Sequence, residues 1–288
     1  MSGSFRNVIS INDKSAIEPL SNKELSIGIT PGGFLFAIMD PNGLQCLSLE
    51  EHHFTNNDAK EELLESLIDF FSSHPLLSQT FQKVQLSYFS PHYVMIPESV
   101  YDPGNIESYY LFCAPMSDKH QVVADRLEAI GAFGIYAVPD QLTNFAGEKS
   151  RDFRIRHQAS VLIDSVFTNQ QEDEHKADVV LHIKPGHFEI LLIHQQKLLC
   201  YKSYFCQVFD DVLYYLFYLL ELYGMDANQK KLMLIGELQT DADEVAILKN
   251  FFPQVIFPNR NAKFKFSKLF SHFPEHYYYN LFNLVKCE

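Results

Sequence analysis

The sequence lacks the short motifs that identify several classes of enzyme and metal site. It has no G-x-S-x-G elbow for a nucleophilic serine and no GxxxxGK[ST] phosphate loop. It also has no C-x-x-C pair that would indicate zinc binding or thiol exchange. We therefore interpret the five widely spaced cysteines as reduced thiols, mostly buried: Cys46, Cys113, Cys200, Cys206 and Cys287.

A secretion signal and a long apolar run are also missing. The first twenty residues contain no basic start followed by an apolar stretch. The most apolar segment, residues 212–220, is followed by Glu221 and is much shorter than the roughly 20 residues that cross a bilayer. We expect a cytoplasmic protein without a membrane span, in which residues 212–220 form a buried helix.

Basic residues are scarce relative to acidic ones. The chain has 23 Lys and Arg against 36 Asp and Glu, a formal net charge of −13 that repels phosphate backbones and argues against a nucleic-acid partner. We interpret the densest basic run, residues 149–157, as a solvated face. The 288 residues, 47% of them hydrophobic, can bury a large core in one large domain or two fused halves.

One pattern occurs twice in this chain. Residues 29–34 read ITPGGF and residues 183–188 read IKPGHF. Aligned without gaps, residues 26–47 and 180–201 share six identities in 22 positions, where ordinary composition gives roughly one or two. The identical pairs are Ile29 and Ile183, Pro31 and Pro185, Gly32 and Gly186, Phe34 and Phe188, Leu44 and Leu198, and Cys46 and Cys200.

Each copy predicts a three-stranded antiparallel meander. An apolar strand meets a Pro-Gly turn, a second strand leaves it, and a third strand follows a second turn, because proline fixes φ and glycine tolerates positive φ. A helix follows each meander, at residues 58–71 and 210–223, and then a further strand, at residues 84–89 and 232–236. The first helix should have one wet face, whereas the second, apolar nearly all round, should be packed on most sides.

The first copy is followed by segments that the second copy lacks. We expect a strand at residues 109–114, a helix at residues 118–130, and later a strand at 134–138 and a helix from Asp140. The polar residues 168–176 separate the copies as a turn or linker. The predicted organisation is an N-terminal extension (1–24), a first half (25–170) with an inserted subdomain at about 91–130, and a second half (171–288).

The doubled βββαβ order resembles the superfamily of actin, the sugar kinases and the heat-shock ATPases. It is most similar to a bacterial domain-of-unknown-function family with that fold and to the actin-like proteins of type IV pilus assembly. The resemblance covers about residues 25–285 and depends on element order and the two turns. It implies an α/β fold of duplicated actin-like (ribonuclease H-like) halves that face each other across a cleft.

In that superfamily the two meander turns bind phosphate, and nucleotide with magnesium lies between them. The resemblance places Thr30, Gly32 and Gly33 in the first phosphate loop, and Lys184, Gly186 and His187 in the second. The acidic residue that each loop normally supplies to the magnesium is missing from both. Lys184 stands where an acid is expected, and is either a direct phosphate ligand or an exposed turn residue.

The superfamily also has a paired glycine near the adenosine, and here only Gly236 matches it. Glu237 takes the second position, where a side chain would crowd a base. Gly236 is therefore either a ligand contact or a strand-end glycine. Asp140 is either an acid of the cleft or, before a helical run, an N-cap.

The remaining candidates are the histidines and the aromatic tail. His52 and His53 are adjacent and should point to different sides, and His272 and His276 have Pro274 between them, so we predict no metal site. We predict no catalytic residue either. The aromatic residues near the end, 273–282, form either core or an exposed docking surface.

Two functions compete. The first is a degenerate actin-like protein, a non-catalytic scaffold or protein-binding module with weak or no binding of ATP or ADP. By resemblance, its partner is a peptide or the tail of a membrane protein, engaged by residues 91–130. The second is an active ATPase or small-molecule kinase whose metal-binding acids come from elsewhere, such as Asp140 or Glu237. A third hypothesis is another duplicated α/β fold, which a structure without a cleft between the halves would favour.

Overall fold

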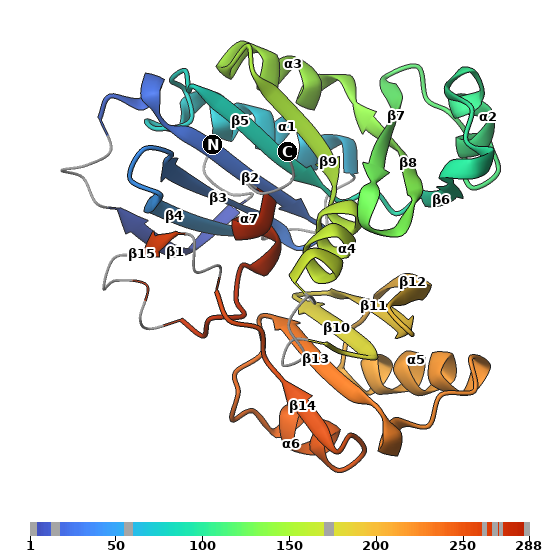
Figure 1. The fold of residues 1–288 in the computed structure, drawn as a ribbon. Helices are drawn as coiled ribbons and strands as arrows, with labels where there is room; N and C mark the ends of the chain where they lie inside the picture. Colours follow the sequence, from blue (N-terminus) through green and yellow to red (C-terminus); the bar gives the residue numbers. More distant parts are fainter. Residues whose placement is uncertain are drawn as a thin grey trace.

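The structure is a computed structural model of the chain and describes residues 5–12, 18–54, 60–169, 176–260, 264–266, 270 and 273–284. Two β-sheets lie one above the other in Figure 1, each with helices on its outer side. Helices α4 (Gln158–Asn169) and α7 (Tyr279–Leu284) lie between the two sheets. No helix in the described ranges is both long and apolar enough to cross a membrane.

The first sheet contains seven strands built around the first meander. In spatial order six of them are β1 (Phe5–Asn12), β4 (Gln45–Phe54), β3 (Gly33–Asp40), β2 (Glu24–Thr30), β5 (Lys83–Tyr88) and β9 (Phe153–His157). The seventh, β15 (Lys265–Phe266), pairs with the start of β4. The meander β2–β3–β4 is antiparallel, and β5 lies parallel to β2, which is the predicted βββαβ order.

The second sheet repeats this arrangement with five strands. In spatial order they are β12 (Lys197–Phe205), β11 (His187–His194), β10 (Val179–Lys184), β13 (Lys231–Gly236) and β14 (Gln254–Ile256). Strands β10, β11 and β12 form the second antiparallel meander, and β13 lies parallel to β10 as β5 lies parallel to β2. The structure thus confirms the doubled α/β fold.

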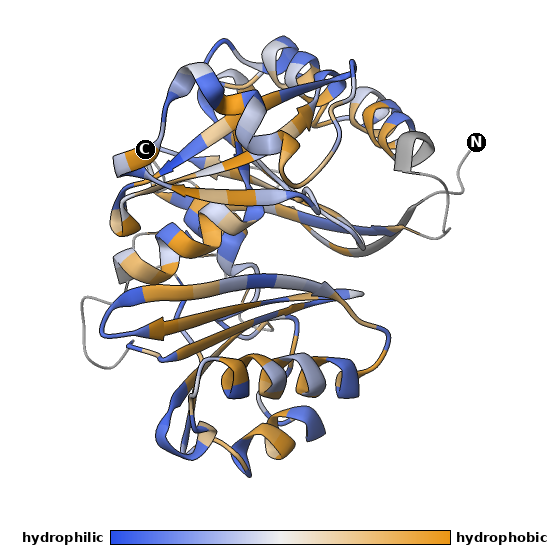
Figure 2. Ribbon diagram, turned by 90° about the vertical axis from the view of Figure 1, so that its right-hand side faces the viewer, coloured by the Kyte–Doolittle hydropathy of each residue, from blue (hydrophilic) through white to orange (hydrophobic). Residues whose placement is uncertain are grey.

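Strands β3 and β11 show why both meanders are apolar on both faces. Alternate side chains of a strand point to opposite faces of the sheet. From β3, Phe34 and Phe36 pack with α1 (Lys60–Ser73), while Leu35 and Ala37 pack with the C-terminal aromatic residues. The alternating residues of β11 divide in the same way between α5 (Phe209–Leu222) and α4. Figure 2 shows the resulting concentration of apolar residues in both sheets.

Helix α1 has the wet face that was predicted, because Glu65 and Asp69 are exposed while Leu67 and Phe71 are buried. The predicted first residue of this helix, Asp58, lies outside the described residues. Helix α5 does not have the predicted environment. Its residues Tyr214, Tyr218 and Leu222 are exposed, so the helix is packed on one side only.

The inserted segment forms a three-stranded sheet in the order β6 (Tyr93–Pro97), β8 (Ala132–Pro139) and β7 (His120–Leu127). Two predictions were wrong here. Residues 118–130 do not form a helix, because β7 pairs along its whole length with β8. Residues 109–114 do not form a strand, because α2 (Ile106–Leu111) packs Tyr110 against the sheet.

The predicted solvated basic face at residues 149–157 was also wrong in part. Arg156 is 2% exposed, and its Nη2 lies 2.6 Å from a carboxylate oxygen of Asp164 in α4. Burial lowers the pKa of His157 to about 4. These two residues form the end of β9, and both are buried.

Three further helices and the chain ends complete the fold. Helices α3 (Asp140–Lys149) and α6 (Asp243–Lys249) cover the first and second sheet respectively. All of α7 is buried, and it packs against α4, β2 and β5. The aromatic tail, in its described part, is therefore core. Strands β1 and β15 both pair with β4, while the division into 1–24, 25–170 and 171–288 stays a prediction.

Candidate functional site

The two Pro-Gly turns lie directly against each other. The first turn joins β2 to β3, and Oγ1 of Thr30 donates a hydrogen bond to the carbonyl oxygen of Gly33 at 3.2 Å. The second turn joins β10 to β11. A Cβ atom added to Gly32 would lie 2.8 Å from the carbonyl oxygen of Pro185. At their tips the halves therefore leave no room even for a methyl group.

A small cavity lies beside this contact. It is lined by four of the predicted residues, Thr30, Gly32, Gly33 and Lys184, and also by Phe34, Leu35, Glu51, His53, Pro185 and Glu237. Only about 10 Å³ is open to the centre of a water-sized sphere. That is room for about one water molecule.

The other three predicted residues do not line this cavity. Gly186 has φ +76° and no atom near the position of a Cβ. Gly236 has φ +99°, and a Cβ there would collide with the carbonyl oxygen of Ile183. His187 is 1% exposed and packs against Phe89 with ring centroids 5.1 Å apart. Burial lowers the pKa of His187 to about 4, so this imidazole is neutral near pH 7.

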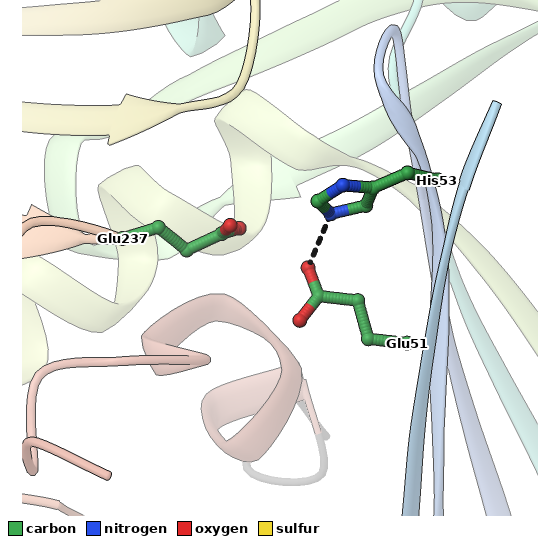
Figure 3. A group of neighbouring side chains, drawn as sticks. All are labelled: Glu51, His53 and Glu237. Carbon is green, nitrogen blue, oxygen red and sulfur yellow. Dashed lines mark hydrogen bonds and ion pairs between the residues drawn. The ribbon is translucent and has the colours of Figure 1, made fainter. Parts of the chain in front are cut away.

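Three acid or imidazole side chains converge on the cavity from both halves. Glu51 and His53 project from β4, whose residues pair with Leu35 and Gly33 of β3, and Glu237 directly follows β13. Their ligand atoms all lie within 4.8 Å of one another. Figure 3 shows the three side chains pointing toward one another, with Nε2 of His53 3.1 Å from Oε1 of Glu51.

Two more side chains already engage these carboxylates. Nζ of Lys184 lies 3.6 Å from Oε1 of Glu237, and Lys184 is buried. The hydroxyl of Tyr278 donates a hydrogen bond of 2.9 Å to Oε2 of Glu51. Lys184 is thus not an exposed turn residue, and its ammonium is paired with a carboxylate.

The pKa values of the Glu51 and Glu237 carboxyl groups are shifted in opposite directions. Burial alone would raise the pKa of Glu51, but the hydrogen bond with His53 and the charge of Lys184 lower it below its usual value. Burial raises the pKa of Glu237, and the charge of Lys184 only partly opposes this. One cation thus serves two acids, buried Glu51 and partly buried Glu237, of which Glu51 holds its negative charge more firmly.

Glu51 was not singled out in the sequence, and His53 was considered there only as a metal ligand and rejected. They lie two positions apart on a strand, so they share one face, but nothing local indicated that this face meets the second turn. His52 and His53 do contact different surroundings, as predicted: the ring of His52 stacks on Phe34. Asp140 does not line the cavity and is not an N-cap, since it is the first residue of α3 and Pro139 precedes it.

Glu51, His53 and Glu237 are the described residues that could hold a metal ion. They do not fit magnesium with a nucleotide. Magnesium prefers oxygen ligands in a near-ideal octahedron, whereas one of these ligands is an imidazole. The carboxylates are engaged by Tyr278 and Lys184, and the cavity has no space for phosphates.

A second group of buried polar side chains surrounds Glu189 in the second half. Glu189 of β11 accepts hydrogen bonds from Tyr201 at 2.7 Å and from Gln158 of α4 at 3.1 Å, and it contacts His182 at 2.7 Å. Although burial opposes ionisation, His182 and Tyr201 lower the pKa of Glu189 to about 2. The protein itself thus supplies three polar partners to this buried carboxylate.

Comparisons with known proteins agree with this architecture. The family described as "Protein of unknown function (DUF3822)" matches residues 12–255. No curated protein matches the chain. A Bacteroides thetaiotaomicron protein with actin-like ATPase fold and unknown function has a TM-score of 0.73 at 18% identity, covering 95% of this chain and 99% of that one. The PilM–PilN type IV pilus biogenesis complex has a TM-score of 0.61 at 10% identity, covering 93% and 99%.

Proposed function

This chain belongs to the DUF3822 family of proteins of unknown function and has the actin-like ATPase fold, and from this premise we propose that it is a pseudo-ATPase. It binds another protein and does not turn over a nucleotide. The observation that carries the proposal is the direct contact of Gly32 with Pro185, at the place where the resemblance puts the phosphates.

The volume at this place supports the same conclusion. Pockets for small molecules and cofactors typically measure about 300 Å³ or more. The space between the turns is about 10 Å³. A nucleotide would therefore require the halves to separate and the ion pair of Lys184 with Glu237 to open.

The position of Lys184 also supports the proposal that this site has lost its divalent cation. Two buried carboxylates that face each other need a positive charge nearby, which a divalent cation supplies in an active phosphoryl-transfer site. Here the ammonium of Lys184 lies beside Glu237 and acts on Glu51. The protein thus carries its own cation, which offsets part of the negative charge of the two carboxylates without a ligand.

A protein partner is supported by one of the similar structures, which is the PilM–PilN type IV pilus biogenesis complex. We extend this to the present chain only as a mode of action: an actin-like fold that holds a segment of another protein. The inserted segment offers exposed apolar side chains for this, with Phe112 88% exposed and Val100 64% exposed. We place the protein in the cytoplasm, with a peptide or the tail of a membrane protein as its partner.

One observation favours the competing function. Glu51 and Glu237 place two carboxylates between the turns, so an active ATPase or small-molecule kinase would find acids there after the halves had opened. The two functions differ in whether nucleotide binding depends on magnesium and on Glu237.

Calorimetric titration of the full chain with ATP and ADP, with and without magnesium, tests the proposal, together with a phosphate-release assay. We expect no magnesium-dependent binding at millimolar nucleotide and no turnover, because the cavity is closed and its acids are paired. Phosphate release that disappears in the Glu237→Gln variant, but persists in Glu221→Gln on the outer surface, would establish the ATPase instead.

A further inference from the structure

Helix α5 carries an exposed aromatic face that the sequence analysis expected to be buried. At helical spacing Asp210, Tyr214, Phe217, Tyr218 and Glu221 share one side of the helix. Tyr214 is 65% exposed and Tyr218 is 50% exposed. Their rings are stacked with centroids 6.4 Å apart, so they form one continuous surface.

A second element turns this face into a groove. Phe251, just after α6, is 41% exposed and packs edge-on against Phe217 with ring centroids 4.7 Å apart. The hollow between the helices measures about 440 Å³ and is lined by Leu213, Tyr214, Phe217, Tyr218, Glu221 and Phe251. Exposed tyrosine and phenylalanine side chains of this kind are enriched at the centres of protein interfaces.

The charges at the ends of the groove indicate the kind of partner. Asp210 and Glu221 are both exposed, and α5 contains no lysine or arginine. An antiparallel pair of α5 helices from two copies would bring Asp210 of one copy near Glu221 of the other, and like charges repel. The surface of an anionic membrane would be repelled for the same reason. The electrostatics therefore favour a basic partner.

We propose that the groove of α5 binds an amphipathic basic helix of a partner protein. Apolar residues at positions i, i+3, i+4 and i+7 of that helix cover Tyr214, Phe217 and Tyr218, while its lysines or arginines pair with Asp210 and Glu221. The inference rests on the proposed function, since it names a partner class for the protein-binding role. It adds a contact on the second half to the one proposed for the inserted segment.

The test uses a fluorescein-labelled peptide of leucine and lysine only, about three helical turns long, with leucines at i, i+3, i+4 and i+7. Fluorescence anisotropy follows its binding to the full chain. We expect Tyr214→Ser with Tyr218→Ser to weaken binding at least about tenfold, because the anchoring rings are lost. Both side chains are at least half exposed, and circular dichroism confirms that the variant is folded.

Two controls separate this result from general attraction to an acidic protein. The same peptide with glutamate at every lysine position should not bind. The Leu44→Ser variant changes an apolar side chain in the first half that is 47% exposed, and should bind the Leu/Lys peptide like the wild type. Equal binding by the double tyrosine variant, or a loss in Leu44→Ser alone, would overturn the proposal.

The same variants also test two other occupants of the groove, a second copy of the chain and a membrane surface. A dimer seen by sedimentation that dissociates in the double tyrosine variant would assign the face to a second copy and overturn the proposal. Binding to phosphatidylserine vesicles that requires Tyr214 and Tyr218 would assign it to a membrane surface. Because nucleotide turnover is measured separately, failure of this proposal is distinguishable from failure of the proposed function.

Discussion

At the scale of single residues, Lys184 is the most consequential departure from the pattern that the two turns resemble. It was predicted as a phosphate ligand or an exposed residue, and it is a buried partner of Glu237. The identity of the residue could be read from the sequence. Its role depended on Glu237, which lies 53 positions later and was considered only as an alternative acid.

Gly236 and Gly186 allow a matched comparison of how strictly the backbone requires glycine at each position. Both have positive φ, where a Cβ costs about 1–2 kcal/mol. Only Gly236 would also collide with a backbone atom, the carbonyl oxygen of Ile183. We expect Gly186→Ala to lower the free energy of unfolding by about 1–2 kcal/mol and Gly236→Ala to lower it clearly more.

Urea denaturation of the two variants measures the difference. Equal losses would mean that the strand end at Gly236 relaxes easily and that the glycine is not required for backbone packing.

At the scale of helices and strands, the elements predicted from strong local periodicity were correct, whereas those predicted from weak periodicity were wrong. The meanders and the helix α5 were found because alternating or continuous apolar residues extend over their whole length. Strand β7 and helix α2 were predicted as the opposite type. Their state is decided by pairing with β8 and by packing of Tyr110, contacts that local propensity does not contain.

Helix α7 offers the test at this scale. Its six residues are all buried between the sheets, so packing and not helix length stabilises it. We expect Phe282→Ala to lower the free energy of unfolding by about 3–5 kcal/mol, as for a large-to-small substitution in a core.

The matched control is Phe112→Ala, which removes the same atoms from a side chain that is 88% exposed. It should change stability by less than about 0.5 kcal/mol. A comparable loss in both variants, measured by urea denaturation, would contradict the assignment of α7 to the core.

At the scale of the whole molecule, Lys184, Glu237, Glu51 and His53 connect the two halves. Lys184→Met leaves buried Glu51 and partly buried Glu237 without their cation, and we expect the free energy of unfolding to fall by about 1–3 kcal/mol at pH 7. The loss should shrink as the pH falls to 5. The pKa of Glu237 is already raised, and without Lys184 it rises further, so at lower pH the carboxyl takes up a proton and its buried charge disappears.

The control is Lys230→Met. Lys230 pairs with Asp178 at 3.5 Å in the same half, where the partners are 19% and 36% exposed, so the expected cost is below about 1 kcal/mol. Urea titrations at pH 7 and pH 5 provide both comparisons. A loss in Lys184→Met that is the same at both pH values would show that Glu237 does not depend on the lysine.

The sequence by itself predicted the duplicated meanders and their Pro-Gly turns, and the resemblance that these carry implied the actin-like fold. Those features arise from local chemistry: alternating apolar residues, proline that restricts φ, and glycine that permits tight approach. Only the tertiary structure decided that Gly32 touches Pro185, that Glu51 and His53 meet Glu237, and that one side of α5 stays exposed. These depend on how two halves separated by over a hundred residues pack together, and no local pattern encodes the distance between them.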